Sequence, residues 1–131
     1  MRRYGLFVIG LLVALALGTS SQAQRERWIY LGDAHVDGAV DHDNIHVGME
    51  DGKFRAIQLR VGGGGVEFDR VIVHFGNGSE ETLPIHQRIP SGGRTAAIDL
   101  PGDRRVIRSV EMWYSKGRWE RRPKVTLYGI R

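Results

Sequence analysis

The sequence predicts an all-β fold, an antiparallel β-sandwich of jelly-roll type with about eight strands. Short runs of alternating apolar and polar residues are separated by Gly, Asn, Asp and Pro, which turn the backbone. No window of 11 residues sustains the i, i+3, i+4, i+7 apolar spacing of an amphipathic helix, so helix is limited to single turns. The turn signals recur at the spacing typical of a sandwich, and a small closed barrel is the alternative.

The amino-terminal half contains three predicted strands, over 28–31, 44–47 and 54–61. The last of these alternates most clearly. Ile57, Leu59 and Val61 share one face, while Gln58 and Arg60 point the other way. This pattern predicts a strand with one face on the core.

A long strand is predicted over 66–75, with an irregularity in its middle. Val66 and Phe68 have one parity and Val71 has the other, so an extra residue near Asp69-Arg70 is expected as a β-bulge. Asn77-Gly78 then predicts a tight hairpin turn with positive φ angles, leading into a partner strand over 82–85.

The carboxy-terminal part contains three more predicted strands, over 95–100, 106–114 and 124–130. In the second of these, Val110, Met112 and Tyr114 share a face, and simple alternation places Ile107 on the opposite one.

Residues 1–23 have the order of a secretory signal peptide. Arg2 and Arg3 are followed by an apolar run over 5–17, and Ser21-Gln22-Ala23 fits a cleavage site. The run is shorter than the roughly 20 residues of a membrane span, although an uncleaved anchor and the twin-arginine route remain alternatives. We expect export and a single mature domain over 24–131. The chain has no cysteine, which excludes lipid attachment through one and leaves the domain without disulfides. Together these features suggest a periplasmic or secreted bacterial protein.

Charge is unevenly distributed along the mature chain. Residues 24–83 hold 11 acidic and 6 basic residues, whereas residues 84–131 hold 4 acidic and 11 basic residues. Such asymmetry indicates either a surface that faces anions or two regions of the fold that attract each other.

The densest polar segment, 35–46, contains three carboxylates and three imidazoles. Its candidate metal ligands are Asp37, Asp41 and Asp43, and calcium suits them better than zinc. The segment lacks the EF-hand spacing, and a turn-rich loop without metal explains the same residues. We therefore expect no cofactor, with calcium as the possible exception.

Motifs of catalysis are absent from the sequence. It has no Gly-x-Ser-x-Gly, no His-Glu-x-x-His and no cysteine, and the adjacent Glu80 and Glu81 point to opposite faces of a strand. The glycine runs at 62–65 and 92–93 are not followed by a helix that could receive a phosphate. We expect no enzymatic activity, and an unusual hydrolase is an alternative.

A basic, aromatic segment precedes the last strand. Its candidate ligand-binding residues are Lys116, Arg118, Trp119, Arg121 and Arg122. Cations beside an exposed ring suit an acidic glycan or an anionic lipid headgroup, and export argues against nucleic acid. The alternative is that Trp113 belongs to the core and the arginines form a solvated edge.

Seven short motifs follow one another along the mature chain: Tyr30-Leu31-Gly32, Asp43-x-Ile45-x-Val47, Phe54-Arg55-Ala56-Ile57-Gln58-Leu59, Val73-x-Phe75-Gly76-Asn77-Gly78, Ile98-Asp99-Leu100-Pro101-Gly102, Arg105-Val106-Ile107-x-Ser109-Val110 and Val125-x-Leu127-Tyr128-Gly129. With this set the chain resembles a family of small exported bacterial β-sandwich proteins of unknown function. The resemblance implies the fold and no catalytic residues.

These observations together favour a non-catalytic binding or structural module of the bacterial cell envelope. The ligand expected for it is an acidic glycan or another anionic surface. A calcium-stabilised domain using the loop 33–46 is the first alternative.

Overall fold

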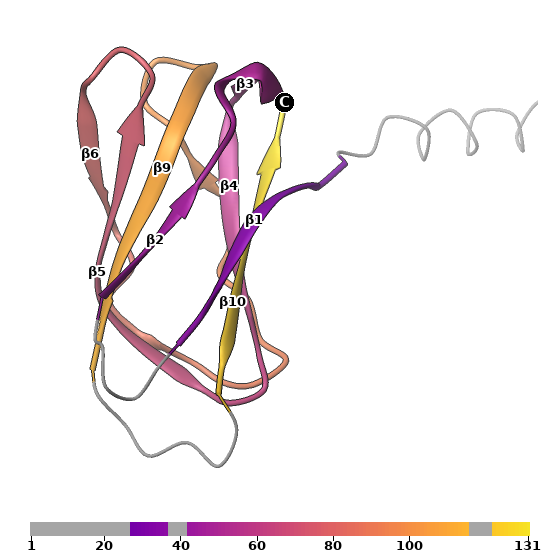
Figure 1. Cartoon of the computed structure of the whole chain (residues 1–131), viewed down its shortest axis with the longest axis vertical. Helices are drawn as coiled ribbons and strands as arrows, with labels where there is room; N and C mark the ends of the chain where they lie inside the picture. Colours follow the sequence, from indigo (N-terminus) through magenta and orange to yellow (C-terminus); the bar gives the residue numbers. More distant parts are fainter. Residues whose placement is uncertain (1–26, 37–41, 116–121) are drawn as a thin grey trace, which may run out of the picture.

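The computed structural model describes residues 27–36, 42–115 and 122–131. A four-stranded and a six-stranded antiparallel sheet pack face to face (Figure 1). The first, called the β1 sheet, has the order β1 (Ile29–His35), β10 (Lys124–Ile130), β4 (Ala56–Gly62) and β8 (Ile98–Asp99). The second, called the β2 sheet, has the order β2 (His42–His46), β9 (Arg105–Tyr114), β5 (Val66–Phe75) and β6 (Glu80–Leu83).

Three short elements complete the described part of the fold. The strand β3 (Lys53–Phe54) pairs with β9, β7 (Arg88–Ile89) pairs with β5, and η1 (Met49–Asp51) is one turn of 3₁₀ helix. Among the described residues no helix is long and apolar enough to cross a membrane.

The strand order is that of a jelly roll. Successive main strands alternate between the two sheets, except that β5 and β6 form a hairpin within the β2 sheet. Each sheet keeps two edge strands, so the structure is a sandwich and not a closed barrel. This confirms the predicted fold, with the eight expected main strands and the two short additions β3 and β7.

The core lies between the sheets and is built by alternate residues of the long strands. Its fully buried members include Leu59, Leu127, Phe68, Val73 and Met112. Burying a side chain of this size contributes about 1.5–3 kcal/mol, so the sandwich needs no disulfide.

Two bulges set which residues of β5 and β9 face the core. On β5 the register shifts between Phe68 and Arg70, which confirms the bulge predicted near Asp69. On β9 it shifts between Ile107 and Ser109, leaving Arg108 as the extra residue. The expectation that Ile107 faces away from the core is therefore wrong: the bulge returns its side chain to the core, where it is fully buried.

Other predicted strands differ from the structure at their ends. The strand expected over 54–61 divides at Arg55, because Phe54 pairs with β9 and Ala56 pairs with β10. Only residues 98–99 of the strand predicted over 95–100 are in β8. In the β5–β6 hairpin Gly78 has a φ of 90°, whereas Asn77 is not among the residues with positive φ. The turn is thus a longer loop ending in a left-handed glycine.

Candidate functional site

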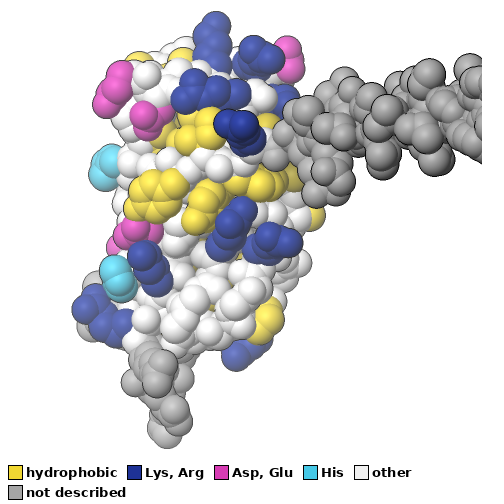
Figure 2. Space-filling view, turned by 90° about the vertical axis from the view of Figure 1, so that its right-hand side faces the viewer, with side chains coloured by type: hydrophobic (Ala, Val, Ile, Leu, Met, Phe, Trp, Pro, Cys, Tyr) yellow, Lys and Arg dark blue, Asp and Glu magenta, His cyan; other side chains and the backbone are white. Residues whose placement is uncertain are grey.

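The outer face of the β1 sheet carries a pair of aromatic rings. Tyr30 of β1 lies opposite Tyr128 of β10, and the two rings meet edge to face with centroids 6.1 Å apart. Tyr30 is 55% exposed, one of two large apolar side chains exposed among the described residues. Figure 2 looks onto the side that carries this sheet and shows a band of hydrophobic side chains with Lys and Arg side chains above and below it. The face therefore combines an accessible ring with nearby cations.

Arg60 of β4 lies flat on the second ring. Its guanidinium carbon is 3.8 Å from the centroid of Tyr128, and its Nε donates to Oε1 of Gln58 at 2.9 Å. Gln58 in turn donates from Nε2 to the carbonyl of Thr95 at 3.0 Å. These contacts explain why Gln58, which points outward as predicted, is nevertheless buried. They fix one edge of the guanidinium and leave other N–H donors for partners beyond this network.

A carboxylate and an amine complete this surface. The Tyr30 hydroxyl donates to Asp33, and this hydrogen bond raises the pKa of the phenol above its usual 10.0. Lys124 Nζ lies 3.8 Å from the same carboxylate. We call Tyr30, Tyr128, Gln58, Arg60, Asp33 and Lys124 the aromatic face.

Further cations border the aromatic face. Arg94 is exposed and pairs with Arg60 in an isolated β-bridge, and Arg122 is exposed just before β10 begins. Against these four cations, Asp33 is the acidic group within the defined face. The surface is thus suited to an anionic ligand.

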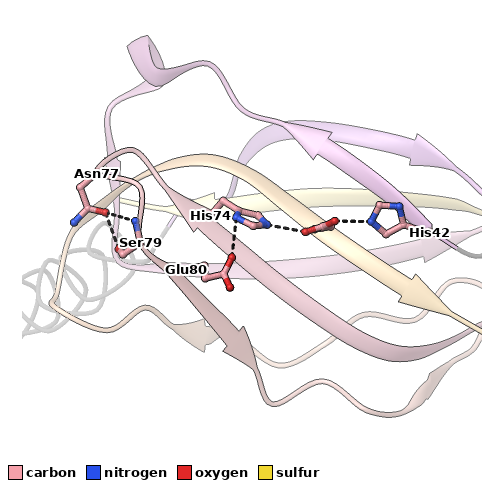
Figure 3. A network of polar contacts seen from close by, with 6 residues as sticks. His42, His74, Asn77, Ser79 and Glu80 are labelled. Carbon is pink, nitrogen blue, oxygen red and sulfur yellow. Dashed lines mark hydrogen bonds and ion pairs between the residues drawn. The ribbon is translucent and has the colours of Figure 1, made fainter.

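A different arrangement occupies the outer face of the β2 sheet. One side chain from each of the four main strands of this sheet joins a continuous network, which Figure 3 shows from close by. The carboxylate of Glu111 on β9 makes two hydrogen bonds. One oxygen lies 2.6 Å from Nε2 of His42 on β2, and the other lies 2.7 Å from Nε2 of His74 on β5. His74 Nδ1 also lies 3.3 Å from a carboxylate oxygen of Glu80 on β6. We call these four residues the His–Glu network.

The network lowers the pKa of its central carboxylate, Glu111. The hydrogen bond from His74 is the main reason that the pKa of Glu111 lies below its usual 4.5, with His42 adding to the effect and desolvation opposing it. Both ring nitrogens of His74 face carboxylates, which accept hydrogen bonds when ionised. Each ring nitrogen of His74 thus already has a carboxylate partner within the network.

Trp113 lies on this outer face as well. The His42 ring is 4.6 Å from the Trp113 ring, centroid to centroid, and the guanidinium carbon of Arg70 is 4.0 Å from that ring's centroid. The alternative that placed Trp113 in the core is therefore wrong. Its neighbours Met112 and Tyr114 are buried in the core, so strand alternation turns Trp113 outward.

The residues singled out from the sequence are only partly within the described structure. Asp37, Asp41, Lys116, Arg118, Trp119 and Arg121 lie outside the described residues. Asp43 is described, and its carboxylate accepts a hydrogen bond from the Tyr114 hydroxyl at the edge of the core. Within the ranges 27–36, 42–115 and 122–131, no group of three or more His, Asp or Glu side chains could hold a metal ion.

Neither outer face was identified from the sequence. The signal available was outward parity: Asn44 and His46, for example, alternate with the apolar Ile45 and Val47 on the strand predicted over 44–47. Parity alone does not reveal which strands are neighbours. His42 and Glu111 are separated by 69 positions in the sequence and meet only through the pairing of β2 with β9.

Comparison with known proteins locates this chain among families. A solved structure from a structural and functional characterization of Pseudomonas aeruginosa AlgX aligns with a TM-score of 0.52 and 11% sequence identity. The alignment covers 77% of this chain and 26% of the AlgX chain, so it concerns the fold alone. No curated protein matches this chain. The family model described as a domain of unknown function, DUF2541, matches residues 10–129. Since the match spans most of the chain, it confirms the resemblance to a family of unknown function, and the protein belongs to the DUF2541 family.

Proposed function

We propose that this protein is an exported, non-catalytic binding module of the bacterial cell envelope that recognises an acidic glycan through the aromatic face. The observation that carries the proposal is the exposed Tyr30 ring beside Tyr128, with Arg60 and Lys124 next to them. A sugar ring presents C–H groups that pack on an aromatic ring, and a carboxylate or sulfate on the same sugar accepts hydrogen bonds from guanidinium and ammonium groups.

The shape of the surface supports a polymer in preference to a small molecule. The ring pair and its cations follow neighbouring strands of the open β1 sheet, and the bordering Arg94 and Arg122 extend the positive surface. A polymer with repeated negative charges can contact several of these groups at once, whereas an isolated monosaccharide contacts few of them.

The proposed continuation of the site is the segment that precedes β10. Its residues Lys116, Arg118, Trp119 and Arg121 adjoin Arg122 in the sequence, and Trp119 would provide a further ring. We expect them to contribute to the same ligand.

A non-catalytic role is supported by the His–Glu network. His74 is the histidine with a carboxylate at each ring nitrogen, which leaves it unsuited to proton abstraction. An unusual hydrolase would need a base from elsewhere in the chain.

Export is supported by the leader pattern of residues 1–23. Sequencing the amino terminus of protein recovered from the envelope fraction tests it. We expect the chain to begin at Gln24, and recovery of the intact leader in the cytoplasm would contradict this part of the proposal.

Binding of polygalacturonate, with dextran as the neutral polymer, tests the ligand class by isothermal titration calorimetry. We expect binding to polygalacturonate alone. Tyr30→Ala and Arg60→Gln are each expected to weaken it by about tenfold or more, since a stacking or charge-assisted contact is lost. Trp119→Ala with Arg118→Ala is expected to weaken it similarly, with an unchanged melting temperature.

Met49→Ala is the matched control, because Met49 is 52% exposed but lies in η1, outside the aromatic face. Equal binding to dextran, or full affinity in both Tyr30→Ala and Arg60→Gln, would contradict the proposal. A fall in melting temperature in these variants would instead indicate a structural role.

A further inference from the structure

A depression of about 350 Å³ lies on the outer face of the β2 sheet, away from the aromatic face. Its lining residues are Asn44, His46, His74, Arg108, Ser109 and Glu111. The strand register explains why it forms. Ser109 of β9 lies between His46 of β2 and His74 of β5, so the small side chain is flanked on both sides by larger ones.

The bulge in β9 adds a cation to this depression. Arg108 is the extra residue of the bulge, and its side chain is exposed at the rim while its carbonyl accepts from Val47 N at 2.9 Å. Without the bulge, strand alternation would give Arg108 and Ser109 opposite faces. The irregularity thus lets both residues line one depression.

Hydrogen-bond donors outnumber acceptors in the lining. Guanidinium, imidazole, hydroxyl and amide N–H groups can all donate, and the one carboxylate is Glu111. Both oxygens of Glu111 already receive imidazole nitrogens, from His42 and His74. The negative charge at this end of the depression is therefore already paired, and the guanidinium of Arg108 and the Ser109 hydroxyl face an opening that an external acceptor can enter.

The cation of the site is Arg108, and His46 and His74 line the depression with it. The acidic groups facing them are Glu111 and, across β5, Glu80. On the β2 side, Trp113 stacks on His42 and brings no charge, while Arg70 lies on the Trp113 ring.

We propose that this depression is a second binding site, specific for an oxyanion such as a phosphate, sulfate or carboxylate group, with Ser109 at its floor and Arg108, His46 and His74 around it. The oxyanion accepts from the guanidinium of Arg108 and from the Ser109 hydroxyl. The site is independent of the aromatic face, because its residues belong to the other sheet.

Nuclear magnetic resonance of the full chain tests this proposal, with inorganic phosphate, inorganic sulfate and galacturonate as three separate probes at constant ionic strength in chloride. We expect saturable amide shifts centred on residues 108–111, 44–46 and 74 at pH 5.5 with at least one probe. Phosphate or sulfate acting alone would identify a tetrahedral group, and galacturonate acting alone would identify a carboxylate.

Arg108→Gln is expected to weaken the binding about tenfold, since it removes a charge-assisted hydrogen bond. Arg104→Gln is the matched control. Arg104 is exposed and lies directly before β9, but it does not line the depression. Ser109→Ala keeps the fold with the smallest change in volume and should weaken binding without removing it.

Two results would overturn the proposal. One is the absence of saturable shifts with all three probes, and the other is an equal loss of affinity in Arg104→Gln and Arg108→Gln. The polygalacturonate measurement on Tyr30→Ala is unaffected by these outcomes, so failure of the second site is distinguishable from failure of the proposed function.

Discussion

The two outer faces of the sandwich are built on equal numbers of main strands but use different chemistry. On the aromatic face, groups stack: Arg60 covers Tyr128, and Tyr30 meets the same ring at its edge. On the β2 sheet, hydrogen bonds and ion pairs dominate: the His–Glu network joins the four main strands through two imidazoles and two carboxylates. One fold thus presents a stacked surface and a hydrogen-bonded one.

Neutralising one carboxylate on each face, Glu111 and Asp33, should give the largest difference in the free energy of unfolding between the two faces. Glu111→Gln should lower the free energy of unfolding at pH 6 by about 1.5–3 kcal/mol, because two charge-assisted hydrogen bonds lose their acceptor charge. Asp33→Asn should cost less than about 1 kcal/mol, because its amine partner is 3.8 Å away and half exposed. Urea unfolding of the two variants measures the difference. Equal losses would show that both faces depend on charge to the same degree.

The loss of stability at acid pH should come in part from the β2 sheet, through Glu111. The folded pKa of Glu111 lies below 4.5, so its contribution is present above pH 4.5 and is lost as the pH falls through the lower, folded pKa. We expect the urea midpoint of the wild type to fall in that acid range. Glu111→Gln should fall less steeply there, and an unchanged slope would contradict the assignment. Asp33→Asn serves as the control on the other face.

The loss of stability at alkaline pH should come in part from the aromatic face, through Tyr30. It is the smallest of the expected effects. The pKa of Tyr30 is raised above 10.0 by its hydrogen bond to Asp33, so this contribution is present below pH 10 and is lost as the pH rises through the folded pKa. Absorbance at the phenolate band should show a late-titrating contribution from Tyr30. Tyr30→Phe should reduce the late component, and an unchanged late component would contradict the assignment.

The fold followed from the sequence because its longest strands have unambiguous patterns. The bounds predicted for β5 and β10 agree with the structure, and the parity change at Asp69 located a bulge. The bulge at Arg108 was missed, since Val106 and Ile107 are both apolar and either parity fits the pattern. The division at Arg55 was missed because the alternation continues through it, while the chain changes sheets.

The candidate sites could not be predicted to the same extent. Each face is formed by strands that are distant in the sequence, and a single sequence gives their parity but not their partners. Charge composition left two interpretations open, an anion-facing surface or two regions that attract each other, and the proposed binding face on β4 and β10 depends on the first. The sequence candidates Trp119 and Asp37 remain predictions, because they lie outside the described residues.

Arg55 has a consequence for how the two faces could work together. Its amide donates to the carbonyl of Ile130 and its carbonyl accepts from Leu100, both at 2.8 Å, while the preceding Phe54 pairs with β9. At this end one continuous segment belongs to both layers, so the sheets cannot slide past each other without breaking the pairing on one side. Packed sheets lie about 10 Å apart. If both faces bind as proposed, their ligands are held at a fixed spacing on opposite sides of one small domain. Such a protein would act as a rigid bivalent connector, whose avidity for two linked anionic groups depends on their separation.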